Sequence, residues 1–133
     1  MEKLEARRLA KKMIVRTGVD LIEIDRIAEV VSRHGKRYLE RVYTPGELSL
    51  CGKRKESLAG RFAAKEAVAK ALGCGIGEVA WKEIEILENE RKSPTIRLHG
   101  EADRVASQLG LRTWSLSITH NQSQAIAFVV ALG

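Results

Sequence analysis

Aromatic residues are scarce in this chain, at 5% of its 133 residues, and it has only two cysteines. So few aromatic side chains disfavour a protein that binds single-stranded nucleic acid by base stacking. Cys51 and Cys74 are too few for a disulfide framework and lack the spacing of a metal site, which favours reduced thiols. The N-terminus has no signal-peptide core, and the longest apolar run, Ala125 to Leu132, is too short to cross a bilayer. We therefore expect a cytoplasmic protein without a membrane segment.

The composition is that of one folded domain, with 44% hydrophobic and 30% charged residues. The net charge is +6, but residues 1–16 alone hold six basic and two acidic side chains. The high isoelectric point, about 9.6, is therefore largely a property of the N-terminus. A basic nucleic-acid-binding domain remains a competing interpretation, although the charge distribution gives it little support. We expect residues 1–12 to form a charged extension and residues 13–133 to form the domain.

One segment, from Leu58 to Leu72, is apolar on almost every side when it is read as a helix. Ten of its residues are Leu, Ala, Phe or Val, one is glycine and four are charged. Such a helix is usually packed on nearly every side, and charges on it are costly unless they are paired or ligated. Glu66 and Lys70 lie one turn apart on it. They either pair with each other or face a ligand that needs both signs, such as a metal-bound phosphate.

The remaining elements alternate between strand and helix patterns. We expect strands at 13–19, 83–88, 95–99, 114–119 and 125–132, with the last two forming a hairpin. We expect helices after residue 23 until Gly35, from Thr44-Pro45-Gly46-Glu47 onward, at 58–72 and at 101–109. This order predicts a single α+β domain with a mainly antiparallel sheet and one long buried helix.

Several polar residues have two readings on local grounds. Asp20 ends the first predicted strand three residues before Glu23, which favours helix capping over a functional carboxylate. His120, between a strand and a loop, is either simply exposed or part of a site. The basic residues after Asp20 would share one side of a continuous helix and form either a solvated face or a surface for an acidic partner. They are Arg26, Arg33, Arg37 and Arg41. Lys53-Arg54-Lys55 is either a loop or a phosphate-binding cluster.

Three segments together resemble a known family. They are Gly18-Val-Asp20, Leu58-Ala-Gly-Arg-Phe-Ala-Ala-Lys-Glu-Ala-Val-Ala-Lys70 and Ser117-Ile-Thr-His120. In this order and spacing, roughly residues 13–132 resemble the holo-acyl-carrier-protein synthases, the small bacterial type of phosphopantetheinyl transferase. The resemblance implies a homotrimer with sites at subunit interfaces. It also implies a magnesium-dependent reaction of fatty acid biosynthesis, in which phosphopantetheine passes from coenzyme A to a serine of apo acyl carrier protein and 3′,5′-ADP is released.

The resemblance also implies roles for individual residues. Asp20 and Glu66 match the magnesium ligands, and Glu66, directly or through a water, would accept the serine proton. Lys70 would bind phosphate and offset charge on the leaving group. The positions that would contact the nucleotide end of coenzyme A are Arg61 and His120, together with Lys53 and Lys55 of the basic cluster. Arg26 and Arg37, supported by Arg33 and Arg41, match the carrier-docking arginines. A coenzyme A-binding module without catalysis is a further alternative, against which both carboxylates and Lys70 speak.

Overall fold

The computed structural model describes residues 2–4 and 13–133, so most of the predicted N-terminal extension lies outside the described residues. The strands are β1 (Val15–Glu23), β2 (Ile84–Glu88), β3 (Pro94–Leu98), β4 (Thr113–His120) and β5 (Gln124–Leu132). The helices are α2 (Ile24–His34), α3 (Lys36–Val42), α4 (Pro45–Cys51), α5 (Lys55–Leu72) and α6 (Gly100–Gln108), with a 3₁₀ turn η1 (Trp81–Glu83). This α+β arrangement confirms the predicted fold class.

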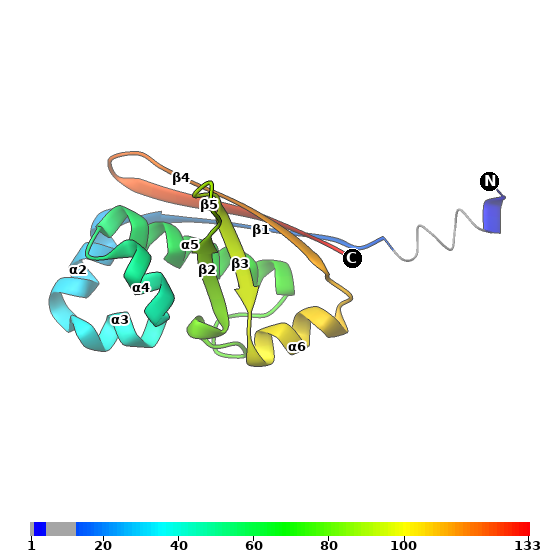
Figure 1. The fold of residues 1–133 in the computed structure, drawn as a ribbon, viewed down its shortest axis with the longest axis horizontal. Helices are drawn as coiled ribbons and strands as arrows, with labels where there is room; N and C mark the ends of the chain where they lie inside the picture. The colour runs from blue at the N-terminus through cyan, green and yellow to red at the C-terminus, as the bar shows by residue number, and fades with distance from the viewer. Residues whose placement is uncertain (1, 5–12) are drawn as a thin grey trace.

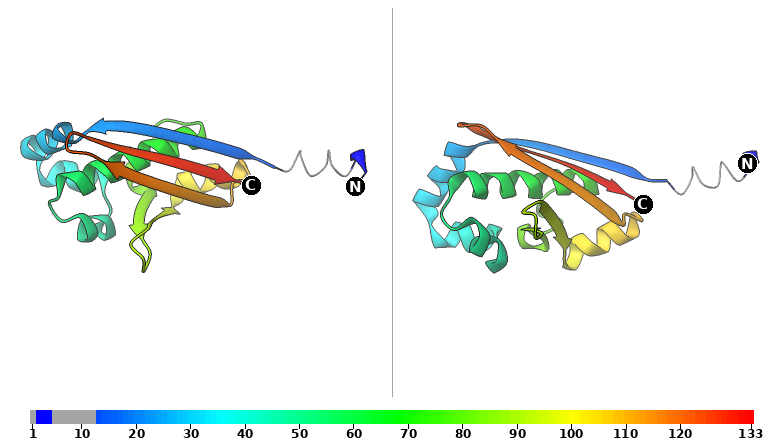
Figure 2. Two further views of the ribbon diagram at one scale, coloured as in Figure 1. Left: turned by 90° about the horizontal axis from the view of Figure 1, so that it is seen from above. Right: turned by 45° about the horizontal axis from the view of Figure 1, so that its top comes forward.

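Two antiparallel sheets organise the molecule. The larger has the order β1-β5-β4, and the smaller is the β2–β3 hairpin. The long helix α5 lies beneath the larger sheet, while α2, α3 and α4 gather at one end and α6 at the other (Figure 1). Figure 2 shows the hairpin projecting from the side of α5 that lies away from β1. The buried core surrounds α5: it includes Ala127 and Val129 of the larger sheet and also Ile84 and Ile86 of the hairpin.

Small residues let α5 approach the sheet closely. Its buried positions are mainly alanines, among them Ala63 and Ala67. Gly18 of β1 faces the helix, and a Cβ atom there would overlap the backbone carbonyl of Ala67. The helix ends at Gly73, which adopts the left-handed conformation (φ 74°) that glycine tolerates best. Strand β1 can therefore run almost against the backbone of α5.

Two local predictions about the helical end of the molecule are confirmed. Thr44 and Glu47 form the predicted capping box at the start of α4. Gly35, at φ 51°, separates α2 from α3, so the basic segment is two helices rather than one continuous helix.

The first strand differs from the prediction. It runs from Val15 to Glu23 and does not end before Asp20. The capping interpretation of Asp20 is therefore wrong, because the N-cap of α2 is Glu23, which makes no capping hydrogen bond through its side chain. Instead, Asp20 lies inside β1 on the face that packs on α5, opposite Ala127 of β5.

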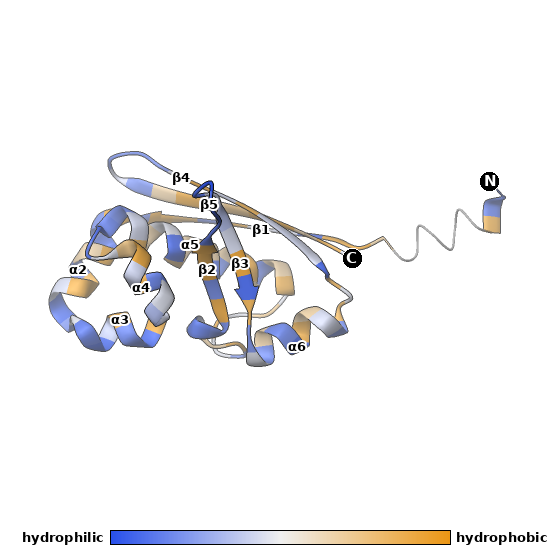
Figure 3. Cartoon of the chain, viewed as in Figure 1, coloured by the Kyte–Doolittle hydropathy of each residue, from blue (hydrophilic) through white to orange (hydrophobic). Residues whose placement is uncertain are grey.

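The other face of the larger sheet is apolar and uncovered. The large hydrophobic side chains exposed on it are 44–59% accessible: Val15, Val19, Leu21, Phe128 and Leu132. Val19 and Phe128 lie directly opposite each other in the β1–β5 pairing. The hydropathy of these strands is shown in Figure 3. Exposed apolar surface of this extent is typical of an interaction site. Within the described residues, none of the helices combines the length and apolar character needed to cross a membrane.

Candidate active site

The carboxylates of Asp20 and Glu66 come together where β1 crosses α5. Burial raises the pKa of Glu66, the neighbouring Asp20 carboxylate raises it further, and Lys70 partly offsets both. The glycine at position 18 makes this proximity possible, because it removes the side chain that would hold β1 away from α5. Two segments far apart in the sequence thus supply a pair of like charges.

Lys70 supplies the positive charge of this site. Its Nζ donates to Val19 O at 2.8 Å and lies 3.2 Å from Asp20 Oδ1. Lys70 therefore forms its ion pair with Asp20. One of the two interpretations of the sequence was an ion pair between Lys70 and Glu66, and the structure instead pairs Lys70 with Asp20. Because the Lys70 side chain is 55% exposed, its ammonium group lies within reach of a bound anion.

The chemistry of this pair fits a magnesium ion. Mg²⁺ is commonly held by one or two carboxylates, with substrate phosphates and water completing its octahedron. Within residues 2–4 and 13–133, no group of three or more His, Cys, Asp or Glu side chains could hold a metal. Asp20 and Glu66 could together offer carboxylate oxygens to such an ion.

A cleft opens beside the N-terminal half of α5. One part, of about 560 Å³, is lined by Arg54, Glu56, Ser57, His120, Asn121 and Gln122. An adjoining part of about 200 Å³ shares Glu56, Ser57 and His120 with it. The remaining lining residues of that part are Gly60, Arg61, Glu88, Lys92, Pro94 and Ile118. Three cationic side chains, two glutamates and one imidazole therefore surround a space large enough for a phosphorylated ligand.

This cleft and the carboxylate pair lie on different sides of α5. Arg61 reaches from α5 to Ile86 O of β2 (3.1 Å), whereas Lys70 reaches from α5 to β1. His120 ends β4, which is separated from β1 by β5. Among the described residues, those that line the cleft do not include Asp20, Glu66 or Lys70. Within one chain, the cleft and the carboxylate pair are therefore two separate features.

The other predicted binding residues are distributed unevenly. Lys53 and Lys55 are exposed just before and at the start of α5, where Lys55 forms an ion pair with Asp25 (3.4 Å). Arg54, between them, lines the cleft. Of the four predicted docking arginines, Arg37 and Arg41 line a hollow of about 420 Å³ with Val30, His34 and Tyr38. Arg26 is exposed on α2, and Arg33 pairs with Glu29 (3.1 Å).

The sequence did not reveal which charges of α5 are buried. The fully buried one is Lys65, which lies 2.7 Å from the equally buried Glu47, whereas Glu66 is half-buried and Lys70 is exposed. Burial lowers the pKa of Lys65, and Glu47 opposes this effect. No local signal marks the pair, because Glu47 already has a role in a capping box.

Comparison with known proteins places this geometry in context. A sequence profile described as "4'-phosphopantetheinyl transferase superfamily" matches residues 16–129. A curated protein of Herpetosiphon aurantiacus named "Holo-[acyl-carrier-protein] synthase" is 53% identical over 124 residues, which are 88% of this chain and 98% of the relative.

Solved structures are similar over the same region. The Helicobacter pylori holo-[acyl-carrier-protein] synthase in complex with coenzyme A has a TM-score of 0.80 at 36% identity, covering 86% of this chain and 98% of that one. The Bacillus anthracis holo-(acyl-carrier-protein) synthase in complex with CoA (3',5'-ADP) has a TM-score of 0.74 at 34% identity, covering 91% and 98%.

Proposed function

The chain belongs to the 4′-phosphopantetheinyl transferase superfamily, and from this premise we propose that Asp20, Glu66 and Lys70 transfer phosphopantetheine with the help of Mg²⁺. The reaction moves this group from coenzyme A to a serine of apo acyl carrier protein and releases 3′,5′-ADP, a step of fatty acid biosynthesis. The proposal depends mainly on one observation: the carboxylates of Asp20 and Glu66 are neighbours where β1 crosses α5, and Lys70 Nζ lies 3.2 Å from Asp20 Oδ1.

Each of the three side chains has a distinct task. Asp20 and Glu66 would hold Mg²⁺, which neutralises charge on the pyrophosphate of coenzyme A and eases attack on its β-phosphorus. Glu66, directly or through a water, accepts the proton of the attacking serine hydroxyl. As the serine oxygen bonds to the β-phosphorus, the bond to the bridging oxygen of ADP breaks. Lys70 then offsets the charge that remains on the leaving 3′,5′-ADP.

The cleft beside α5 holds the nucleotide end of coenzyme A. Arg61 and His120 line it, and Arg54 and Lys92 bring further positive charge. The nucleotide end of the ligand carries several phosphate charges, which Arg54, Arg61 and Lys92 would bind, while Glu56 and Glu88 of the same lining would lie apart from them. Lys53, just before α5, and Lys55, its first residue, add positive charge that attracts the phosphates at longer range.

A homotrimer brings together two half-sites from neighbouring subunits. The carboxylate half-site is Asp20 with Glu66, and the cleft half-site is the cleft lined by Arg61 and His120. The uncovered apolar face runs along β1 and β5, and its residues Val19 and Leu21 flank Asp20 in the sequence. Covering this face with other subunits buries the apolar side chains and brings the edge of β1 to a neighbouring chain. The carboxylate pair of one subunit then completes the cleft of its neighbour.

The basic end of the molecule receives the acyl carrier protein. Arg26, Arg33, Arg37 and Arg41 lie on α2 and α3, and the hollow beside Arg37 and Arg41 also contains the apolar side chains of Val30 and Tyr38. Positive rim charges accelerate binding of an acidic partner.

The reaction and both free thiols, Cys51 and Cys74, suit a cytoplasmic protein.

Intact mass spectrometry tests the proposed function. The protein is mixed with apo carrier protein, coenzyme A and Mg²⁺, and the carrier is expected to gain a phosphopantetheine group that does not form when a chelator is present. Glu66→Gln should lower the rate by about 10³-fold without changing the melting temperature. Full transfer by this variant contradicts the role of Glu66. Coenzyme A binding without any transfer supports a binding module, and a magnesium-independent gel shift supports a nucleic-acid-binding domain.

A further inference from the structure

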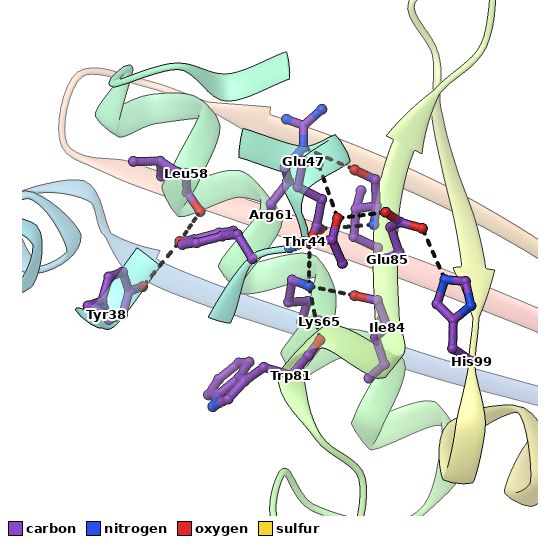
Figure 4. Close-up of polar contacts among 12 residues, drawn as sticks. Tyr38, Thr44, Glu47, Leu58, Arg61, Lys65, Trp81, Ile84, Glu85 and His99 are labelled. Carbon is purple, nitrogen blue, oxygen red and sulfur yellow. Dashed lines mark hydrogen bonds and ion pairs between the residues drawn. The ribbon is translucent and has the colours of Figure 1, made fainter. Parts of the chain in front are cut away.

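Lys65 and Glu47 are the two charged side chains that are fully buried in the described part of the chain. Burying an ion pair costs desolvation energy, and well-packed apolar residues often serve stability equally well. Stability alone is thus a weak reason for this pair. Its contacts indicate what it fixes instead (Figure 4).

The contacts of the pair concentrate on the outer edge of β2. Lys65 Nζ donates to Glu47 Oε1 (2.7 Å), to Ile84 O (2.6 Å) and to Trp81 O (3.0 Å). Glu47 Oε2 accepts from Ile86 N (3.0 Å), and Arg61 Nε donates to Ile86 O (3.1 Å). Three side chains from two helices thus occupy backbone groups of one strand.

The residue spacing of β2 and α5 explains how side chains of the helix can bond to the edge of β2 in the way that a neighbouring strand would. His99 N donates to Glu83 O, so Ile84 and Ile86 direct their backbone groups away from β3. These two residues are about 6.7 Å apart along a strand. Arg61 and Lys65 are one turn apart on α5, about 6 Å along its axis. The two helix residues therefore match the repeat of the strand and bond to alternate carbonyls.

Arg61 connects this edge to the ligand cleft. Its Nε donates a hydrogen bond to Ile86 O, and the same residue lines the cleft. Lys92, on the turn between β2 and β3, and Pro94, the first residue of β3, also line the cleft. We propose that the Glu47–Lys65 pair is a positioning device that fixes β2 and its hairpin on α5, and thereby sets Arg61 and the hairpin wall for coenzyme A. This inference rests on the proposed function, because it assigns coenzyme A to the cleft.

The test removes both charges together. In Glu47→Leu/Lys65→Met no unpaired charge is left buried, but backbone groups of Thr44, Ile84 and Ile86 lose their partners, so the variant should fold with a melting temperature lowered by roughly 10 °C. The Kd for coenzyme A, measured by titration calorimetry without carrier protein, should rise by about tenfold, a scale known for loss of outer-shell partners. A parent-like Kd, measured at a temperature where circular dichroism shows the variant folded, overturns the inference.

A double-mutant cycle with Arg61→Met separates positioning from packing. If the pair acts through Arg61, the Arg61→Met substitution should weaken coenzyme A binding less in the double variant than in the parent chain. If the losses of coenzyme A binding free energy are fully additive, the pair does not act through Arg61. Should the double variant not unfold cooperatively, amide hydrogen exchange of the unaltered chain provides the test. Slow exchange at Ile86, slowed further by 3′,5′-ADP, supports positioning, whereas exchange at the rate of an exposed amide refutes it.

The same titrations distinguish this inference from the proposed function. Glu66→Gln, altered in the chemical step, should still bind 3′,5′-ADP while failing to transfer. If the parent chain binds neither coenzyme A nor 3′,5′-ADP, the proposed function itself is wrong. If the parent binds both and the double variant binds equally well, only the positioning role fails.

Discussion

Lys70 Nζ of α5 lies 3.2 Å from Asp20 Oδ1 of β1. This contact ties the middle of the chain to its first strand, and it brings a cation to a carboxylate that also neighbours Glu66. A pair of carboxylates with one exposed cation beside it suits a reaction in which a phosphate-bearing ligand arrives with a divalent ion. The following predictions test how this group is built and used.

Gly18→Ala should separate β1 from α5. The added methyl group would overlap the Ala67 carbonyl, so one of the two backbones must move. We expect a loss of about 2 kcal/mol in the free energy of unfolding, the usual scale of overpacking, together with lower magnesium-dependent turnover. Gly75→Ala is the matched control, because a methyl group there meets nothing within 4 Å, and denaturant unfolding should show little change. Equal stability of the two variants would contradict the close approach of β1 and α5.

Mixed trimers should recover activity from two inactive variants. Glu66→Gln removes the carboxylate half-site, and His120→Ala damages the cleft half-site. Random assortment of equal amounts gives an intact combination at about one quarter of the interfaces. We expect corresponding transfer after co-refolding of the two variants, measured against each variant refolded alone. Mixtures no more active than the separate variants would mean that each site is contained within one chain.

Phe128→Glu should dissociate the proposed trimer. Phe128 is 47% exposed, opposite Val19 on the uncovered apolar face, and a carboxylate there would be buried without a partner in the assembly. Sedimentation velocity should show monomers with unchanged circular dichroism. Thr95→Glu on β3, also exposed but outside that face, should leave the trimer intact. Unaltered sedimentation of Phe128→Glu would exclude this face from assembly.

Arg26→Glu should weaken the use of carrier protein alone. The side chain is exposed on α2, so charge reversal should repel an acidic partner and leave the cofactor cleft untouched. We expect the carrier KM to rise by about tenfold, less so at high salt, with an unchanged Kd for coenzyme A. Arg112→Glu, in the link between α6 and β4 at the opposite end of the molecule (Figure 1), is the control. An equal loss of coenzyme A binding by Arg26→Glu would contradict a docking role.

Much of the fold could be predicted because its signals are local. The capping box at Thr44, the break at Gly35 and the alternation along β4 and β5 each express backbone geometry within a few residues. Strand β1 was predicted too short because its outward side chains, such as Leu21, are apolar and Asp20 points inward. That pattern is the inverse of a strand with one solvent-exposed face, in which the outward side chains are polar.

The site was predictable in its residue types and only partly in its pairing. The carboxylates of Asp20 and Glu66 were identified from a resemblance, and the structure brings them together across β1 and α5. The pairing of Lys70 with Asp20 instead of Glu66 depends on where β1 crosses the helix, which no local pattern encodes. The buried pair Lys65–Glu47 was missed for the same reason, since its partners are 18 residues apart and on different helices.

Anomalous diffraction from crystals soaked with coenzyme A and Mn²⁺, used in place of Mg²⁺, tests the central claim most directly. We expect one strong anomalous peak that marks a Mn²⁺ ion bound to oxygens of Asp20, Glu66 and the pyrophosphate of coenzyme A. We expect no such peak in Glu66→Gln crystals. A pyrophosphate bound remote from both carboxylates, or an ion bonded to neither of them, would contradict it.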